Sequence, residues 1–542
     1  MFCENTYFKH KNELNKIGSF YVIFRNKMQK LNHRIINNNL TISYKTIEFI
    51  LIFALKHAKI TCKQWYSMLI YLSYSKLLTE NKMTINEIDQ VLNNQRNYFL
   101  SGITLPIKFR IEMLKKLKNT IKKYESDICN ALNQDLGKSK FESYMCEIGL
   151  VLSEISYMIK HTKKFAKEKR VHTPIAQFSA RSYKKPAPYG NVLIMSPWNY
   201  PFLLTLDPLV DAISAGNTAI VKPSAYSPAT STIIEKIITE CFDSSYVAII
   251  TGGRKENASL LDKKFDLIFF TGSQNVGKEV LRRCAENLTP AILELGGKSP
   301  CIIDNTAKIK LAAKRIVFGK FLNCGQTCVA PDYIICDKSI KDELVKELIE
   351  QTKLQFSETP LTNINYGKII NQKHFDRILG LIDSNKVAYG GKSDATKLKI
   401  EPTILDNVTW NDSVMQEEIF GPVLPILTYE KFEDVFNMLQ DKQKPLALYI
   451  FSQNKDHTKA ITSKCSFGGG CVNDCVIHLA TSDLGFSGVG ESGMGAYHGK
   501  DGFDAFSHTK NIVDKKTWID LPMRYQPYTS KTNEKFVRKF LK

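Results

Sequence analysis

The sequence predicts an α/β fold in which a parallel sheet is covered by helices on both faces. After residue 190, short apolar runs alternate with segments long enough to form helices, and Gly, Pro or Ser bounds each run. The runs are NVLIMSP (191–197), NTAIVKPS (217–224), YVAIITGG (246–253) and LIFFTGS (267–273). Such alternation is typical of strands joined by crossover helices.

Length and composition predict a large soluble protein. The chain of 542 residues, 43% hydrophobic and 24% charged, is too long for one core and predicts two or three domains. No apolar run reaches the ~18 residues that span a bilayer, and the N-terminus does not resemble a signal peptide. The thirteen cysteines include no CxxC pair and no Cys/His cluster at zinc spacing. We therefore expect no metal site, and reduced thiols in a cytoplasmic protein.

The basic charge is concentrated in part at the N-terminus. The net charge is +20, and residues 1–82 carry 13 Lys and Arg against 4 Asp and Glu. Such an excess can indicate nucleic acid or an anionic membrane. A genome-wide preference for Lys, Asn and Ile explains it better, because the other lysines are spread out and alternate with acids. We expect no nucleic-acid partner.

The regions before and after the apolar runs have different patterns. Apolar residues recur at helical spacing from Ile107 to Ile121, in a helix that Gly137 would stop, and a second helix covers roughly 140–164. Residues 180–190 are polar and contain proline, which suggests a ribbon or arm. A second α/β region runs from about 293 to 490. The polar, basic tail from about 515 is expected to be partly mobile.

Candidate ligand contacts follow the predicted strands, because parallel sheets bind ligands where strands end and helices begin. Gly272 and Gly277 in TGSQNVG would let the backbone approach a pyrophosphate at a helix N-terminus. This motif is not GxGxxG and is weak by itself. Lys222 lies at a strand end and could bind a ribose or phosphate; the alternative is a solvated surface lysine.

Three further motifs carry candidate catalytic groups. Glu294 lies among apolar residues in LELGGKSP, where burial would raise its pKa as a general base requires; the alternative is a structural ion pair. In MQEEIFGPV, Glu418 and Phe420 could hold and stack a cofactor ring, or simply end a helix. Cys324 and Cys328 in NCGQTC could be half of a metal site, a disulfide, or a nucleophile with a bystander.

Taken in order, these motifs closely resemble one family, the aldehyde dehydrogenases, and within it the class 3 branch that includes fatty and aromatic aldehyde dehydrogenases. The matching strings are PWNYPF, KPSAYSP, FFTGSQNVGKEV, LELGGKSP, GQTCVAPDY, MQEEIFGPVLPI and GVGESGMGAYHGKDGF. The resemblance runs from about Met83 to about Arg524, and the spacing of LELGG and GQxC is highly specific.

The resemblance implies an aldehyde dehydrogenase-like fold. A Rossmann-like NAD(P)-binding domain would cover 83–292, with an arm ribbon at about 177–190, and an α/β catalytic domain would cover 293–500. An oligomerisation strand would lie in 501–525, ahead of a basic tail at 526–542. The ribbon would pair with a strand near 505–516 to form the arm of a homodimer. Residues 1–82 have no counterpart, and are interpreted as an upstream start or a disordered extension; the alternative is a peripheral membrane anchor in IEFILIFALKHAKI.

The resemblance also assigns catalytic roles. Cys328 would attack the aldehyde to form a thiohemiacetal, and the Asn199 side chain and the Cys328 N–H would stabilise the oxyanion. After hydride transfer, Glu294 would activate water to hydrolyse the acyl-thioester. The family's coenzyme A-acylating members lack this Glu, so hydrolysis to a carboxylic acid is favoured. A semialdehyde or coenzyme A-acylating dehydrogenase is the alternative, and a non-catalytic relative would be expected to have lost Cys328, Glu294 or Asn199.

Cofactor contacts follow in the same way. Lys222 would hold the adenosine ribose, Glu418 and Phe420 the nicotinamide ribose and ring, and the pyrophosphate loop would be formed by Gly272, Ser273 and Gly277. Ala225 departs from the family, since NAD-preferring members often place Glu there, where it repels a 2′-phosphate. We therefore expect NADP to be used at least as well as NAD.

The resemblance leaves two smaller expectations. Tyr200 and residues 471–478 would line the substrate channel of an enzyme acting on aliphatic or aromatic aldehydes. Cys324 occupies a position that the family does not reserve for cysteine. It would trap an oxidised Cys328 as a reversible disulfide if the two Cα atoms lay within about 7 Å.

Overall fold

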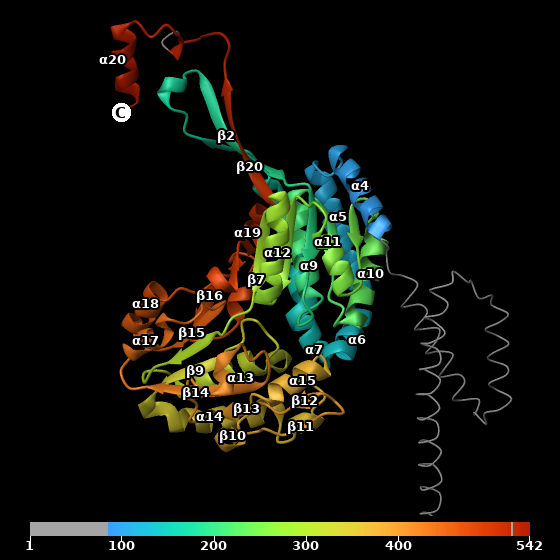
Figure 1. Ribbon diagram of the computed structural model, residues 1–542, viewed down its shortest axis with the longest axis vertical. Helices are drawn as coiled ribbons and strands as arrows, with labels where there is room; N and C mark the ends of the chain where they lie inside the picture. Colours follow the sequence, from blue (N-terminus) through green and yellow to red (C-terminus); the bar gives the residue numbers. More distant parts are fainter. Residues whose placement is uncertain (1–84, 522–523, 542) are drawn as a thin grey trace, which may run out of the picture. The chain divides into compact units, whose positions relative to one another are not determined.

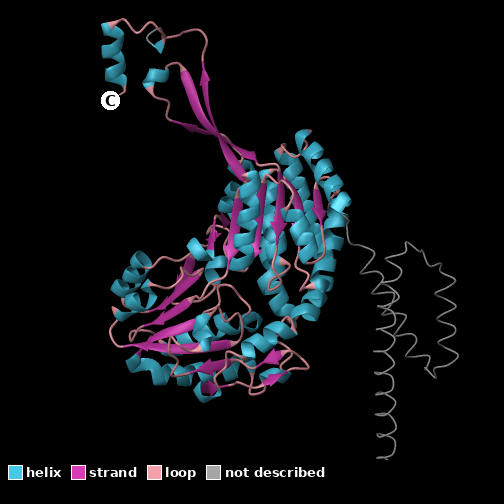
Figure 2. Ribbon diagram, viewed as in Figure 1, coloured by secondary structure: helices cyan, strands magenta, loops and turns pink. Residues whose placement is uncertain are grey.

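The computed structural model describes residues 85–521 and 524–541. The predicted extension at 1–82, with its alternative membrane anchor, lies outside this range. The predicted α/β class is confirmed: helices cover both faces of two sheets, and a separate three-stranded ribbon projects beyond them (Figures 1 and 2). Among the helices of the described residues, none is long and apolar enough to cross a membrane.

The first sheet has six strands in the order β18-β7-β6-β3-β4-β5. Its bounds are β3 Asn191–Met195, β4 Thr218–Lys222, β5 Val247–Ile249, β6 Leu267–Gly272, β7 Ala291–Leu295 and β18 Gly493–Met494. The four apolar runs form β3 to β6, which are mutually parallel, and only the edge strand β18 is antiparallel. These strands are buried on both faces, which explains why the runs are continuously apolar rather than alternating.

Two helical layers enclose this sheet. One face packs against α4 (Ile85–Leu100), α11 (Arg254–Leu261) and α12 (Gln274–Asn287). The opposite face packs against α5 (Ile107–Lys123), α8 (Gly149–Phe165), α9 (Leu203–Ala215) and α10 (Pro228–Cys241). The chain between α5 and α8 forms α6 (Glu125–Leu136), α7 (Lys140–Ser143) and a π-helical turn at Tyr144–Ile148.

The single helix predicted from Ile107 to the stop at Gly137 is two helices. Gly137 does end α6 in a left-handed conformation, as expected. The break falls at Tyr124, whose backbone leaves the helical region. Its hydroxyl donates to Glu240 at 2.6 Å and its ring lies under the Lys236 ammonium, so contacts with α10 hold the kink.

The second sheet has seven strands in the order β10-β13-β14-β9-β8-β15-β16. Its bounds are β8 Pro300–Ile303, β9 Tyr333–Asp337, β10 Val387–Tyr389, β13 Thr403–Leu405, β14 Val423–Tyr429, β15 Ala447–Phe451 and β16 Gly469–Val472. Helices α13 (Ile309–Phe321) and α14 (Lys341–Phe356) cover one face, and α15 (Gln372–Leu379), α17 (Asp434–Gln440) and α18 (Lys455–Lys464) cover the other. All pairings are parallel except that of the edge strand β10.

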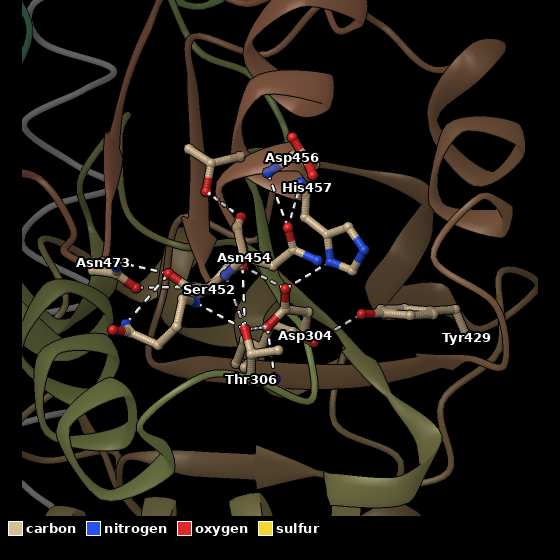
Figure 3. Close-up of polar contacts among 11 residues, drawn as sticks. Asp304, Thr306, Tyr429, Ser452, Asn454, Asp456, His457 and Asn473 are labelled. Carbon is tan, nitrogen blue, oxygen red and sulfur yellow. Dashed lines mark hydrogen bonds and ion pairs between the residues drawn. The ribbon is translucent and has the colours of Figure 1, made fainter.

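A polar network closes the carboxyl end of β8, β15 and β16 (Figure 3). Asp304, directly after β8, is fully buried; it accepts a hydrogen bond from the Ser452 hydroxyl, and its Oδ2 lies 2.8 Å from His457 Nδ1. The Asn473 side chain, after β16, donates to the Ser452 carbonyl at 2.9 Å. Because these groups satisfy one another, this edge of the sheet is filled by the protein's own side chains.

The predicted ribbon pairing is confirmed. β2 (Ala180–Pro188) runs antiparallel to β20 (Ser507–Lys515) from Ala180↔Lys515 to Pro188↔Ser507, and β1 (Lys169–Val171) flanks β2. Figure 1 shows this ribbon extending from α19 (Gly499–Ala505), with the C-terminal helix α20 (Lys531–Phe540) near its end. The predicted tail therefore contains a helix, which begins where the Ser530 side chain accepts the Asn533 N–H.

Candidate active site

A cavity of about 550 Å³ brings together most of the predicted site residues. Those that line it are Asn199, Gly272, Ser273, Glu294, Cys328, Glu418 and Phe420, while Lys222 and Gly277 lie outside its lining. Tyr200 also lines it, as do Val476 and Ile477 from the predicted segment 471–478. The two sheets contribute opposite edges: Asn199 follows β3 and Glu294 lies in β7, whereas Cys328 precedes β9 and Glu418 precedes β14.

The loop that carries Cys328 is held by the Gln326 side chain. Gln326 donates to the carbonyls of Asn323 and Lys368, each at 3.0 Å, and accepts the Ile370 N–H at 3.0 Å. Gly325 has a φ of 72°, and a Cβ there would lie 2.2 Å from the Gly421 carbonyl oxygen. The loop therefore requires glycine at this position, and the Gln–Cys spacing fixes where the thiol lies.

The two cysteines of this loop have different surroundings. Cys328 lines the cavity and packs against the larger core, whereas Cys324 is buried in the smaller core of the second sheet. A Cβ on Gly367 would lie 3.4 Å from Cys324 Sγ, so this sulfur faces the 366–367 turn. The disulfide-trap hypothesis stays a prediction, and these neighbours argue against it.

Burial controls the protonation of the candidate nucleophile. Desolvation, with smaller contributions from the Glu418 and Glu294 charges, raises the pKa of Cys328 to about 12. Hydrogen bonds to the backbone at Cys328 and Val329 act in the opposite direction. The free protein therefore holds a thiol at neutral pH, and the reactive thiolate forms only as the proton is removed.

This protonation state gives a testable pH dependence. The thiolate fraction of a group with a pKa of about 12 grows roughly tenfold per pH unit below that value. We expect the rate of Cys328 alkylation by iodoacetamide, without cofactor, to rise in that proportion between about pH 7 and 10. Mass spectrometry of the 321–333 peptide measures it, and a plateau near neutral pH would contradict it.

Asn199 is positioned by a buried ion pair that sequence reasoning missed. Lys138 and Glu147 have no exposed side-chain surface and lie 2.5 Å apart. The Lys138 ammonium also donates to the Asn199 carbonyl at 3.0 Å, and Glu147 Oε2 accepts the N–H of Phe202 at 2.8 Å and of Leu203 at 3.2 Å. The pair thus fixes the position of the PWNYPF loop through its backbone groups. The helical periodicity around Glu147 contains no signal of this long-range contact.

Breaking this pair should destabilise the protein strongly. Glu147→Gln would remove the carboxylate that directly bonds the buried Lys138 ammonium, so we expect the free energy of unfolding to fall by about 3–5 kcal/mol. Chemical denaturation followed by fluorescence measures this change. The matched control is Glu430→Gln, which breaks the exposed Lys338–Glu430 pair at 2.8 Å and should change nothing measurable. Equal effects would refute the assignment.

Both Asn199 and Glu294 present groups to the cavity. The Asn199 amide is 3% exposed and donates to the Gln326 carbonyl at 3.0 Å, which holds it beside the cysteine loop. Neither Glu294 oxygen has a hydrogen-bond partner among the described residues, so the structural ion pair considered for it is absent there. Burial raises the pKa of Glu294 well above its ordinary value. Its free oxygens are available to water or substrate.

The remaining predicted residues fit a dinucleotide cofactor. Lys222 is not a surface lysine: it is 2% exposed, its ammonium donates to the Gly252 carbonyl at 2.7 Å, and burial lowers its pKa to about 8. Ser273 precedes α12, and its side chain does not cap this helix. Because the first turn of α12 also contains no acid, the N–H groups of that turn can bind a phosphate. Glu418 packs on Gly296, where a Cβ would lie 2.2 Å from Glu418 Oε2, and Phe420 contacts the edge of Trp198.

Gly277 acts by packing. A Cβ there would lie 2.8 Å from a Leu295 methyl group, so the glycine lets α12 approach β7 closely. The assignment of Gly277 to a pyrophosphate loop stays a prediction. In the part of the chain that the structure describes, no group of three or more His, Cys, Asp or Glu is arranged to hold a metal ion.

The fold and site define a class of oxidoreductase with a cofactor-binding sheet, a facing α/β sheet, and a cysteine and a carboxylate in the cavity between them. Comparisons with known proteins identify the class. The family model described as "Aldehyde dehydrogenase family" matches residues 73–512. This chain belongs to the aldehyde dehydrogenase family, and it is an NAD(P)-dependent oxidoreductase that oxidises aldehydes to carboxylic acids.

Individual relatives match over nearly their whole length. The chain is 46% identical over 460 residues to 4,4'-diaponeurosporen-aldehyde dehydrogenase of Staphylococcus aureus, covering 84% of this chain and 100% of that protein. It is 42% identical to the dimeric NADP-preferring aldehyde dehydrogenase of the dog, Canis lupus familiaris, and the match covers 82% of this chain and 99% of that protein. The solved substrate-bound Staphylococcus aureus AldH is 46% identical with a TM-score of 0.82, over 84% of this chain and 99% of that one.

Proposed function

We propose that Cys328, Asn199 and Glu294 carry out the oxidation in the order that the sequence predicts. The Cys328 thiol gives its proton to water in the cavity as its sulfur bonds to the aldehyde carbon, and the Asn199 amide and the Cys328 N–H donate to the resulting oxyanion. NAD or NADP would supply the hydride acceptor when held by Lys222, Ser273, Glu418 and Phe420. Glu294 then takes a proton from water as the water attacks the thioester carbon, and the C–S bond breaks to release the acid. The observation that supports this best is that these three groups share one cavity.

We propose apolar aldehydes, aliphatic or aromatic, as the substrates. Much of the cavity wall is apolar, and the side chains concerned are Met145, Leu150, Leu203, Leu204, Phe318, Leu322, Val476, Ile477, Leu479 and Phe486. Among the lining residues the one ammonium or guanidinium group is that of Arg377, which already bonds Glu417 at 2.9 Å and the Ile419 carbonyl at 2.6 Å. A semialdehyde carboxylate would therefore lack a free cation, which disfavours the semialdehyde alternative.

An aldehyde panel tests the substrate class. Cofactor reduction at 340 nm is followed with straight-chain aldehydes of increasing length, benzaldehyde and succinic semialdehyde. We expect kcat/KM to rise with chain length and to be lowest for the semialdehyde, because each buried methylene contributes about 0.8 kcal/mol. A preference for the semialdehyde, or a requirement for coenzyme A, would replace the proposal with its alternative.

The residue at 225 bears on cofactor choice. Ala225 is exposed and follows Lys222 by three positions, so no carboxylate at this position can bind the ribose hydroxyls or repel a 2′-phosphate. We expect kcat/KM for NADP to equal or exceed that for NAD. Steady-state kinetics with both cofactors decides this, and a preference of more than about a hundredfold for NAD would contradict it.

We propose that the protein is a cytoplasmic homodimer. Its described residues include eleven free cysteines, as expected of a reducing compartment. The arm of β1, β2 and β20 leaves β20 as an open edge strand with Val513 half-exposed, which suits pairing with a second copy.

We also propose two functional domains. Residues 83–292 would form the cofactor-binding domain, and residues 293–500 would form the catalytic domain that carries the nucleophile. Strand β7 crosses the boundary between them.

A further inference from the structure

A second polar cluster lies in the wall of the same cavity, and none of the steps above uses it. Glu154 on α8, Asp207 on α9, and Tyr497 and His498 just before α19 all line the cavity. His498 Nδ1 lies 3.3 Å from Asp207 Oδ2, and the Tyr497 ring stacks on the imidazole with centroids 4.2 Å apart. Three of the four side chains therefore form one contiguous group.

Asp207 has the properties of a group that exchanges protons with the cavity. It is 1% exposed, lines the cavity, and its Oδ1 has no hydrogen-bond partner among the described residues. Burial, and then the neighbouring Glu154, raise the pKa of Asp207 well above its ordinary value, while burial lowers the pKa of His498 to about 4. The pair can hold a proton without a net charge, because a neutral carboxyl and a neutral imidazole need no counter-ion.

The cluster is connected to Glu294 through the backbone. β18 pairs with β7 in the register Gly493↔Glu294 and Met494↔Leu293, which brings the segment ending at His498 alongside the base. Burial, and then the charges of Glu294 and Asp207, raise the pKa of Tyr497 well above its ordinary value, so both carboxylates act on this residue within the same cavity.

We propose that the Asp207–His498 pair is a proton-transfer relay that discharges Glu294 after each hydrolysis, by way of the Tyr497 hydroxyl and water in the cavity. This inference rests on the proposed role of Glu294 as the base. Each hydrolysis forms one C–O bond, breaks the C–S bond with its electron pair going to sulfur, and leaves one proton on Glu294 and a second on the carboxylic acid product. The Cys328 sulfur takes its proton back from the product acid. The proton on Glu294 moves to the Asp207 carboxylate and from there to water in the cavity, and Glu294 regains its electron pair for the next water.

The groups around the relay have distinct contacts. Glu154 Oε1 accepts the Gly499 N–H at 2.8 Å and faces the cavity, where it offers an onward proton acceptor. Asp211 does not line the cavity; its Oδ2 accepts the His498 N–H at 3.4 Å and lies where a Cβ on Gly502 would be 2.0 Å away. Asp211 thus supports the backbone under α19, and it is the matched control for Asp207 on the same helix.

Cofactor-independent hydrolysis of p-nitrophenyl acetate separates the two half-reactions, since the burst reports acylation of Cys328 and the steady state reports deacylation. For Asp207→Asn we expect an unchanged burst and a steady-state rate about tenfold lower, restored by added formate or imidazole. His498→Gln should behave in the same way. Asp211→Asn, whose amide still accepts the His498 N–H, should match the wild type without added buffer acids.

The outcomes separate this proposal from the one on which it rests. An equal loss in Asp207→Asn and Asp211→Asn, or a loss in Asp207→Asn that formate and imidazole fail to restore, overturns the relay. A wild-type steady state in both Asp207→Asn and His498→Gln overturns it as well. If Glu294→Gln keeps the wild-type steady state, the role of Glu294 fails, and the relay fails with it. If Glu294→Gln is slow while both relay variants are fast, the relay alone is wrong.

Discussion

Replacing Cys328 with alanine should abolish aldehyde oxidation, lowering kcat by at least about a thousandfold, because no other group in the cavity lining can carry the acyl intermediate in its place. Cys146, the other thiol that lines the cavity, is 7% exposed and lies in the π-helical turn, whereas Cys328 lies in the loop that the Asn199 amide contacts through the Gln326 carbonyl. The measurement is cofactor reduction with a saturating aldehyde, together with mass spectrometry for a thioester adduct. The variant should form no adduct and still bind the cofactor.

Cys324→Ala is the control for this substitution. Its side chain is buried in the smaller core and faces the 366–367 turn, so we expect activity within a few-fold of the wild type after a modest packing loss. The same variant tests the disulfide trap, because unchanged oxidative inactivation and thiol-dependent recovery would exclude it. Activity that survives Cys328→Ala would refute the mechanism, and a comparable loss in both variants would point to damage of the loop rather than loss of the nucleophile.

Replacing Glu294 with glutamine should lower steady-state turnover by about 10²–10⁴-fold while hydride transfer in the first turnover persists. The reason is that Glu294 acts after thioester formation in the proposed mechanism, and its two oxygens are unpaired among the described residues. Rapid mixing should show a full burst of reduced cofactor followed by a slow steady state. Glutamine keeps the volume of the side chain, so the cavity should retain its shape.

The control for this variant is Asp211→Asn, which changes a fully buried carboxylate that does not line the cavity. It should keep the burst and lose far less of the steady-state rate. A Glu294→Gln enzyme that loses the burst itself would place Glu294 before hydride transfer, in activation of the thiol, and would contradict its assignment as the hydrolytic base.

The sequence was most informative where strands are buried on both faces. The runs that became β3 to β6 are short, continuously apolar and punctuated by Gly, Pro or Ser, so their positions could be predicted without any relative. The same logic pointed to the loops after β3 and β6, whereas the resemblance to the family singled out Asn199 and Ser273 within them. It could not locate Cys328 or Glu418, because the second sheet presents its amino end to the cavity while the Asp304 network fills its carboxyl end.

The parts of the site that escaped prediction depend on contacts between distant residues. Lys138 lies in the loop before α7 and Glu147 in the π-helical turn, and the contact of Lys138 with Asn199 joins residues 61 positions apart. Asp207 lies in a helix that is buried throughout, where an acid carries no periodic signal. These three residues can be recognised as part of the site only when their burial and their contacts are known, because most charged residues in a sequence are exposed to solvent.

The short helix α19 joins the wall of the cavity to the three-stranded ribbon. It begins at Gly499, directly after His498 in the cavity wall, and ends at Ala505, two residues before the first residue of β20 in the arm. The Asn217 amide donates to the Phe506 carbonyl at 2.8 Å and secures this junction to the first sheet. A displacement of the arm would therefore reach the cavity wall through about two turns of helix, which connects the proposed dimer contact with the proposed active site.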